Sequence, residues 1–210
     1  MSPLMAVADT AALDEHPAEE HHKPGGISTS LLGMVLFIAS EVMFFGGLFG
    51  AYFTIRSAAT SWPPEGAGSA HLETWYAAIL TTVLVTSSVT MQLGVWAIRR
   101  NDQRKLVMWL AISMLLGVAF LCGQAYEYSK LIGEGMTLSS GVFGSTFFTL
   151  TGFHGAHVAG GACFILIVLL RARSGQFTAR YHDTVEMASY YWHFVDVVWL
   201  GLFSTIYLLR

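Results

Sequence analysis

The stretch Leu31–Ile55, LLGMVLFIASEVMFFGGLFGAYFTI, decides the fold of this chain. It is long enough to cross a hydrocarbon core of ~30 Å as an α-helix. Glu41 is its only charged side chain and lies well inside it, too far from either end to reach water easily. The sequence therefore predicts a membrane-spanning helix with one carboxyl group at depth, and that carboxyl group needs a polar partner.

Four more apolar stretches follow the first, and short polar joints separate them. The five predicted spans are Leu31–Ile55, Thr74–Ile98, Leu106–Tyr126, Val142–Leu170 and Met187–Leu209. The 210 residues are 54% hydrophobic and only 12% charged, with a mean hydropathy of +0.54, which is typical of a membrane protein. We therefore predict an all-α integral membrane protein, a bundle of about five transmembrane helices within residues 27–210.

Residues 1–26 differ from the rest, because they are acidic, rich in histidine and end in a Pro-Gly-Gly sequence. We expect them to form a flexible polar tail. They lack the basic start, apolar run and cleavage site of a secretory signal peptide. The formal net charge of −3 argues against nucleic-acid binding.

Basic residues gather in two of the joints, one between the second and third spans and one between the fourth and fifth. They are Arg99, Arg100, Arg104 and Lys105 in the first, and Arg171, Arg173 and Arg180 in the second. The positive-inside rule places both joints on the cytoplasmic side. An odd number of spans then leaves the N-terminus cytoplasmic and the C-terminus outside.

Ionisable side chains occupy the middles of three spans: Glu41, then His154 and His157, then His193 and Asp196. The members of each of the last two pairs are three residues apart, so each pair shares a helix face. The imidazole of His193 and the carboxylate of Asp196 also suit a hydrogen bond or a charged pair. Buried ionisable groups in a membrane pair with one another or line a polar cavity. We expect Glu41 to hydrogen-bond to His154, His157 or a neighbouring hydroxyl group.

Two interpretations of these residues stay open at this point: a proton relay or gating site, and satisfied structural groups that hold helices together. A metal site of nitrogen and oxygen ligands is disfavoured, because nothing in the spacing requires a metal. Small residues recur four apart in two spans and predict close approach of helix backbones: Gly46 and Gly50 in the first, and Gly152, Ala156 and Gly160 in the fourth.

Three segments carry a family resemblance, and they occur in order along the chain. They are Phe37–Phe53 (FIASEVMFFGGLFGAYF), Thr151–Val158 (TGFHGAHV) and His182–Leu200 (HDTVEMASYYWHFVDVVWL). Each resembles a signature of subunit III of the haem-copper respiratory oxidases, the cytochrome c oxidase subunit 3 family. The chain is similar to the five-helix bacterial form, since the two additional N-terminal helices of longer members are missing.

The resemblance implies a subunit of a proton-pumping terminal oxidase that reduces dioxygen to water in the aerobic electron transport chain of the bacterial cytoplasmic membrane. In that family haem and copper belong to subunits I and II, so this chain is expected to hold no cofactor, no metal and no catalytic residue of its own. Its expected partners are subunits I and II, mainly subunit I, together with subunit IV, other respiratory complexes and membrane lipids. Its implied role is to stabilise the catalytic core, support proton uptake and bind structural phospholipids.

Residue by residue, the resemblance implies that Glu41 is the family's carbodiimide-reactive intramembrane carboxylate. His154, His157, His193 and Asp196 match its buried polar positions.

His182 and Glu186 match the start of the family's last helix. Arg171, Arg173 and His182, near the basic side, are physically reasonable partners for a phospholipid phosphate, and Glu186 beside them is the fourth lipid-binding candidate. Without the two extra helices, which form one wall of the lipid cleft in longer relatives, another subunit has to supply that wall.

Other functions remain as alternatives. A five-helix quinol oxidase subunit shares this layout, although the Ser40-Glu41-Val42 sequence is more similar to the cytochrome c oxidases. A stand-alone transporter would use the midplane carboxylates and histidines as substrate or proton sites, but it predicts inverted repeats that this sequence does not show. Accessory proteins of nitric oxide reduction also resemble oxidase subunit III.

Overall fold

The structure is a computed structural model and describes residues 28–63 and 73–209. Within them the chain forms five long helices, and the last of these continues into one short π-helical turn. These elements are α1 (Thr29–Ala58), α2 (Thr74–Arg99), α3 (Gln103–Gly133), α4 (Val142–Arg173), α5 (Asp183–Phe203) and η1 (Ser204–Leu208). The all-α prediction is confirmed, whereas the predicted tail over residues 1–26 lies outside the described residues.

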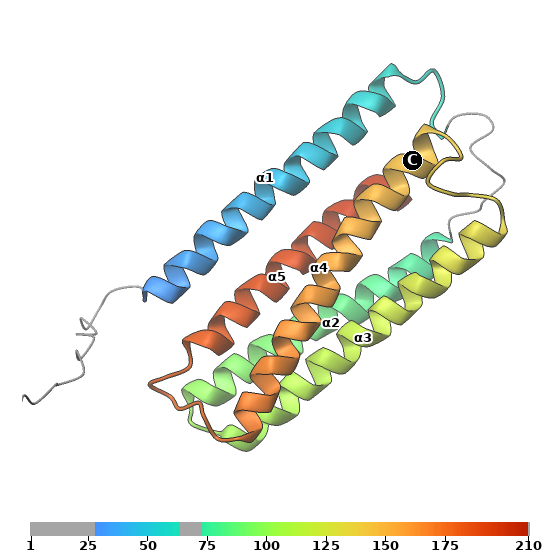
Figure 1. The fold of residues 1–210 in the computed structure, drawn as a ribbon. Coiled ribbons are helices and arrows are strands. Elements are labelled where there is room, and N and C mark those ends of the chain that lie inside the picture. The colour runs from blue at the N-terminus through green and yellow to red at the C-terminus, as the bar shows by residue number, and fades with distance from the viewer. Residues whose placement is uncertain (1–27, 64–72, 210) are drawn as a thin grey trace, which may run out of the picture.

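Helices α2 to α5 form a bundle, and α1 runs along the outside of it, next to α5 and α4 (Figure 1). The start of α1 and the C-terminal end lie at opposite ends of the bundle, as an odd number of crossings requires. The two basic joints meet at one end, where the Ala179 backbone N–H donates to Asn101 Oδ1 at 3.2 Å. This common end is what the positive-inside prediction requires.

Four helices, α1 to α4, are long and apolar enough to cross a membrane. Helix α5 has 21 residues, carries Asp183, Glu186 and Asp196, and is not among these four. The predicted starts at Thr74 and Val142 match α2 and α4. Helix α3 instead continues past the predicted end of its span, to Gly133.

The bundle packs around Trp192 of α5, whose side chain is almost fully buried. A Cβ atom added to Gly117 of α3 would lie 2.6 Å from the Trp192 ring, and one added to Gly161 of α4 would lie 2.9 Å from it. The indole N–H donates to Ser87 Oγ of α2 at 2.8 Å. One side chain therefore fixes the separation of four helices, and the two glycines are required for its ring to fit.

Helix α1 packs quite differently, since Phe45 and Tyr52 are the only buried residues among those described in it. A Cβ atom added to Gly46 or Gly50 would meet nothing within 4 Å, so the predicted close approach of α1 at these glycines is wrong. The predicted close approach at the small residues of α4 is also wrong. At Gly152 and Gly160 the nearest groups are tyrosine hydroxyls at 3.6 Å, not the backbone of another helix.

Candidate functional site

The polar contact between α1 and α4 joins Glu41 to His157. His157 Nε2 lies 3.0 Å from Glu41 Oε2, and His157 Nδ1 lies 2.7 Å from the Phe153 carbonyl oxygen. The two side chains are 19% and 18% exposed. The predicted hydrogen bond of Glu41 is confirmed, with His157 as the partner.

The arrangement of this pair limits where its protons can be. The Phe153 carbonyl oxygen only accepts, so His157 Nδ1 carries a hydrogen and donates to it. Nε2 then either accepts from a protonated Glu41 or donates, as an imidazolium, to a Glu41 carboxylate. In both cases one proton lies between the two side chains. The pair can therefore exchange a proton internally without a change of net charge.

Aromatic rings of α1 lie beside the His157 ring of the Glu41–His157 pair. The His157 ring lies 4.9 Å from the Phe45 ring and 6.1 Å from the Phe44 ring, both of α1. Phe45 also meets Phe194 of α5 at 6.1 Å. These rings reduce the contact of the pair with solvent on one side, and a hydrogen bond is stronger in surroundings of low polarity.

His154 does not take part in this contact, although it is only three residues from His157. It is fully buried, stacks on Trp199 at 4.9 Å and meets the edge of Phe120 at 5.8 Å. Neither of its ring nitrogens makes a hydrogen bond to a described residue. The expectation that His154 pairs with another polar group is therefore not met: it lies among aromatic rings of α3 and α5.

His193 and Asp196 do not pair with each other, so that part of the sequence interpretation is wrong. His193 Nε2 lies 3.3 Å from Gln92 Oε1 of α2. The Asp196 carboxyl group lies beside the Ser88 hydroxyl, and its Oδ1 makes no hydrogen bond of standard geometry to a described residue. Both residues therefore face α2, where Gln92 and Ser88 lie next to them.

At the basic end of the bundle, Arg171 and His182 line one pocket of about 190 Å³. The residues around it are Arg171, Gln176, Phe177, Arg180, Tyr181, His182, Asp183 and Thr184. Arg171 Nε donates to Gln176 Oε1 at 2.9 Å, and its guanidinium group lies 5.2 Å from the Phe177 ring centre. Arg173 is exposed at the end of α4 and does not line this pocket.

Glu186 forms ion-pair contacts between helix ends. Arg99 Nη2 of α2 lies 2.7 Å from Glu186 Oε1, and His182 Nε2 lies 3.1 Å from the same oxygen. The Glu186 side chain therefore ties the end of α2 to the start of α5.

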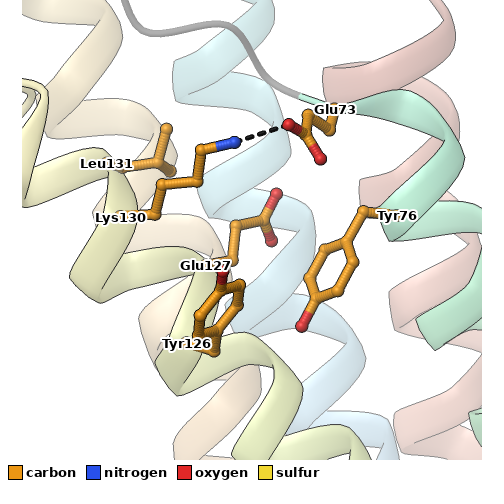
Figure 2. Close-up of a pocket in the computed structure, with 6 residues that line it drawn as sticks. All are labelled: Glu73, Tyr76, Tyr126, Glu127, Lys130 and Leu131. Atoms are coloured by element: carbon orange, nitrogen blue, oxygen red, sulfur yellow. Dashed lines mark hydrogen bonds and ion pairs between the residues drawn. The ribbon is translucent and has the colours of Figure 1, made fainter.

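A buried carboxylate at the other end of the bundle was missed. Glu127 of α3 is 6% exposed, and the Tyr207 hydroxyl lies 3.0 Å from both of its carboxyl oxygens. Lys130 forms an ion pair with Glu73 above it, as Figure 2 shows. The signal was present in the spacing of α3, where the buried positions include Phe120, Gln124, Glu127 and Leu131, alternately four and three residues apart.

Among the described residues, no group of three or more His, Cys, Asp or Glu side chains is placed to hold a metal ion. Several of the polar contacts instead join two elements of the bundle, such as Glu41 with His157 and Glu127 with Tyr207. The arrangement as a whole is that of a multi-pass membrane protein with polar contacts buried between its helices.

Comparison with known proteins identifies the class more closely. The sequence profile of the family described as "Cytochrome c oxidase subunit III" matches residues 12–210. A protein of Corynebacterium diphtheriae named "Cytochrome c oxidase subunit 3" is 47% identical over 179 residues, which are 85% of this chain and 87% of that protein. One of Synechocystis with the same name is 42% identical over 212 residues, covering all of this chain and 89% of that protein.

A third relative, named "Probable cytochrome c oxidase subunit 3", occurs in Mycobacterium tuberculosis. It is 42% identical over 180 residues, which are 85% of this chain and 87% of that protein. This chain belongs to the cytochrome c oxidase subunit III family. The resemblance seen in the three sequence segments is thereby confirmed, and membership implies work within a multi-subunit oxidase complex.

Proposed function

We propose that this chain is the subunit III, without a redox centre, of a proton-pumping cytochrome c oxidase in a bacterial cytoplasmic membrane. The assembly reduces dioxygen to water, with haem and copper held by subunits I and II. The observation that carries the proposal is the family match over residues 12–210. Subunit I is the main partner, and subunit IV and other respiratory complexes are further ones.

The role of the chain in this complex is to support the catalytic core and proton uptake. The Glu41–His157 pair is the candidate for support of proton uptake, because one proton is shared between two helices next to the Phe45 ring. The wide apolar surface of α1 suits contact with lipid and with a neighbouring subunit. Its exposed large side chains are Leu32, Val35, Leu36, Phe37, Val42, Met43, Phe44 and Phe53.

The pocket at the basic end is the candidate lipid site. Arg171, Arg180 and His182 surround it with donors that suit a phospholipid phosphate through charge-assisted hydrogen bonds. We expect Arg171→Gln to lower the amount of anionic phospholipid that copurifies, as measured by lipid mass spectrometry. Arg173→Gln is the matched control, because Arg173 lies on the same helix end outside the pocket. Equal lipid content in both variants would contradict this assignment.

Purification through a tag on this chain in mild detergent tests the function. We expect oxidase subunits I and II in the mass spectrum of the companions and haem bands in the reduced-minus-oxidised absorption spectrum. Activity with reduced cytochrome c but not with quinol would support a cytochrome c oxidase, and the reverse would support a quinol oxidase. A colourless chain that purifies alone would contradict the proposal and favour a transporter.

A further inference from the structure

A small cavity lies where α2 begins and α3 ends, at the end of the bundle opposite the basic joints. It is lined by Glu73, Tyr76, Tyr126, Glu127, Lys130 and Leu131. Its free space is about 20 Å³. A cavity of this size holds one water molecule. Figure 2 shows the Glu127 carboxyl group between the Glu73–Lys130 pair and the Tyr76 ring.

The hydrogen bonds around Glu127 leave room for such a water. A carboxylate offers about four acceptor positions, whereas the Tyr207 hydroxyl group has one hydrogen to donate. That hydroxyl lies at 3.0 Å from both carboxyl oxygens, so it satisfies one position at a time. The Tyr76 hydroxyl donates to the Gly123 carbonyl oxygen at 3.0 Å instead. A buried carboxyl group with so few donors calls for another partner, and the cavity lies next to it.

The Glu73–Lys130 pair connects this cavity to water. Each side chain of the pair is 38% exposed, in contrast to the 6% of Glu127. An ammonium group has three hydrogens, and the bond to Glu73 uses one of them. Lys130 can therefore donate to bulk water and to a water in the cavity at the same time.

A metal ion does not fit the same space. Calcium takes six to eight oxygen ligands and magnesium keeps several of its own waters. The cavity has room for one water, and the Lys130 ammonium group already supplies a positive charge that pairs with Glu73 at its edge. The charged and titratable groups around Glu127 come from every element packed against it: Glu73 just before α2, Tyr76 from α2, Tyr126, Tyr128 and Lys130 from α3, and Tyr207 from η1.

We propose that this cavity is a proton-binding site in which Glu127 takes up and releases a proton through one water, on the aqueous side to which Glu73 and Lys130 are exposed. On uptake, a proton from bulk water passes to the cavity water, and that water passes a proton to a Glu127 carboxyl oxygen. The carboxylate becomes a carboxylic acid and the water is restored. The hydrogen-bond partner of the Tyr207 hydroxyl group then changes from a carboxylate to a neutral carboxylic acid. The strength of the contact between α3 and η1 therefore changes with the protonation of Glu127.

Infrared difference spectroscopy on the purified complex tests this proposal. The complex is placed in vesicles in one orientation, and the pH is changed on one side at a time. We expect the C=O stretching band of a protonated carboxyl group to appear on acidification of the Glu73–Lys130 side and not of the other side. Glu127→Gln removes that band, and Glu73→Gln retains it. A band that follows only the opposite side, or no band at either side, overturns the proposal.

A second variant keeps the test decisive if Glu127→Gln does not assemble. Tyr207→Phe removes the hydroxyl group next to Glu127 and leaves the cavity in place. We expect the carboxyl band to remain and to shift in frequency, whereas an unshifted band assigns it to another residue and contradicts the proposal. Because the band reports a carboxyl group of this chain, its outcome is independent of the oxidase assignment, which the copurifying subunits test.

Discussion

Helix α1 and the bundle of α2 to α5 are held in place by different means. In the bundle, large side chains such as Trp192 and Trp199 are almost fully buried, and Gly117 and Gly161 make room for Trp192. In α1 only Phe45 and Tyr52 are buried, and glycines face open space. The bundle is therefore specified by packing, whereas α1 is attached by a few polar and aromatic contacts.

These contacts lie on one face of α1 at two depths. Glu41 bonds to His157 of α4, and further along the helix the Tyr52 hydroxyl donates to the Thr205 carbonyl oxygen at 3.1 Å. Trp62 Nε1 in turn donates to the Tyr52 hydroxyl at 3.2 Å. Between α1 and α4 a groove of about 130 Å³ remains open beside Tyr52. A helix attached in this way can move without disturbing the core behind it.

The largest expected effect is in the bundle, at Gly117. Gly117→Ala would place a methyl group against the Trp192 ring, and overpacking of this kind costs about 1–3 kcal/mol. We expect a lower thermal unfolding midpoint of the purified complex and partial loss of this subunit. Gly47→Ala in α1 is the matched control, because nothing lies within 4 Å of the added atom. It should be neutral or gain up to about 1 kcal/mol from helix propensity, and equal destabilisation by both changes would contradict the contrast.

A smaller effect is expected at Glu41. Glu41→Ala removes the hydrogen bond to His157, and such a bond within a membrane contributes about 1 kcal/mol. We expect the haem spectrum of the complex to be unchanged and turnover to be lower or to decay sooner, measured as oxygen consumption over time. Ser40→Ala is the control, since its exposed hydroxyl group bonds only to its own helix at Phe37. Loss of all haem would show instead that Glu41 is needed for assembly.

The attachment at the other depth gives a third prediction. Tyr52→Phe removes the bond to the Thr205 carbonyl oxygen and is expected to cost about 0.5–1.5 kcal/mol. Hydrogen exchange followed by mass spectrometry should show faster exchange in Ser204–Leu208 and unchanged exchange in α2. Faster exchange throughout the bundle would mean that α1 and the bundle unfold as one unit.

The smallest effect concerns the turn between α2 and α3. Asp102 accepts from the Lys105 backbone N–H at 3.1 Å, and the Lys105 side chain beside it holds the pKa of Asp102 below its usual range. A lowered pKa stabilises the fold above the ordinary value of about 4 and loses that effect as the pH falls through the lowered value. Thermal unfolding against pH should show a slight acid dependence that Asp102→Asn removes. An identical pH profile in the variant would contradict this.

The sequence predicted the helices well because long apolar stretches leave few alternatives. The C-terminal end of α3 was predicted less well. Hydropathy falls at Glu127 and Lys130, so the span was predicted to end at Tyr126, but the helix continues to Gly133. It can do so because Glu127 turns inward to Tyr207 and Lys130 reaches Glu73 on α2. These partners are distant in sequence and only the fold brings them together.

The polar contacts of Glu41 and the buried histidines were predicted only in part, again because their partners are distant in sequence. The depth of Glu41 required a partner, and His157 was among the candidates. Spacing alone could not separate His157 from His154, since residues three apart differ in direction enough for one to face α1 and the other α3 and α5. Spacing also suggested a His193–Asp196 pair, whereas Gln92 and Ser88 of α2 lie beside them.

The most direct test of the two-part account is a distance measurement between spin labels in the purified complex. One pair would join exposed positions on α1 and α4, and another would join exposed positions on α2 and α5. In Glu41→Ala the account predicts a broader distance distribution for the first pair and an unchanged one for the second. Unchanged distributions for both pairs, or equal broadening of both, would contradict the claim that the Glu41–His157 bond fastens α1 to an independently packed bundle.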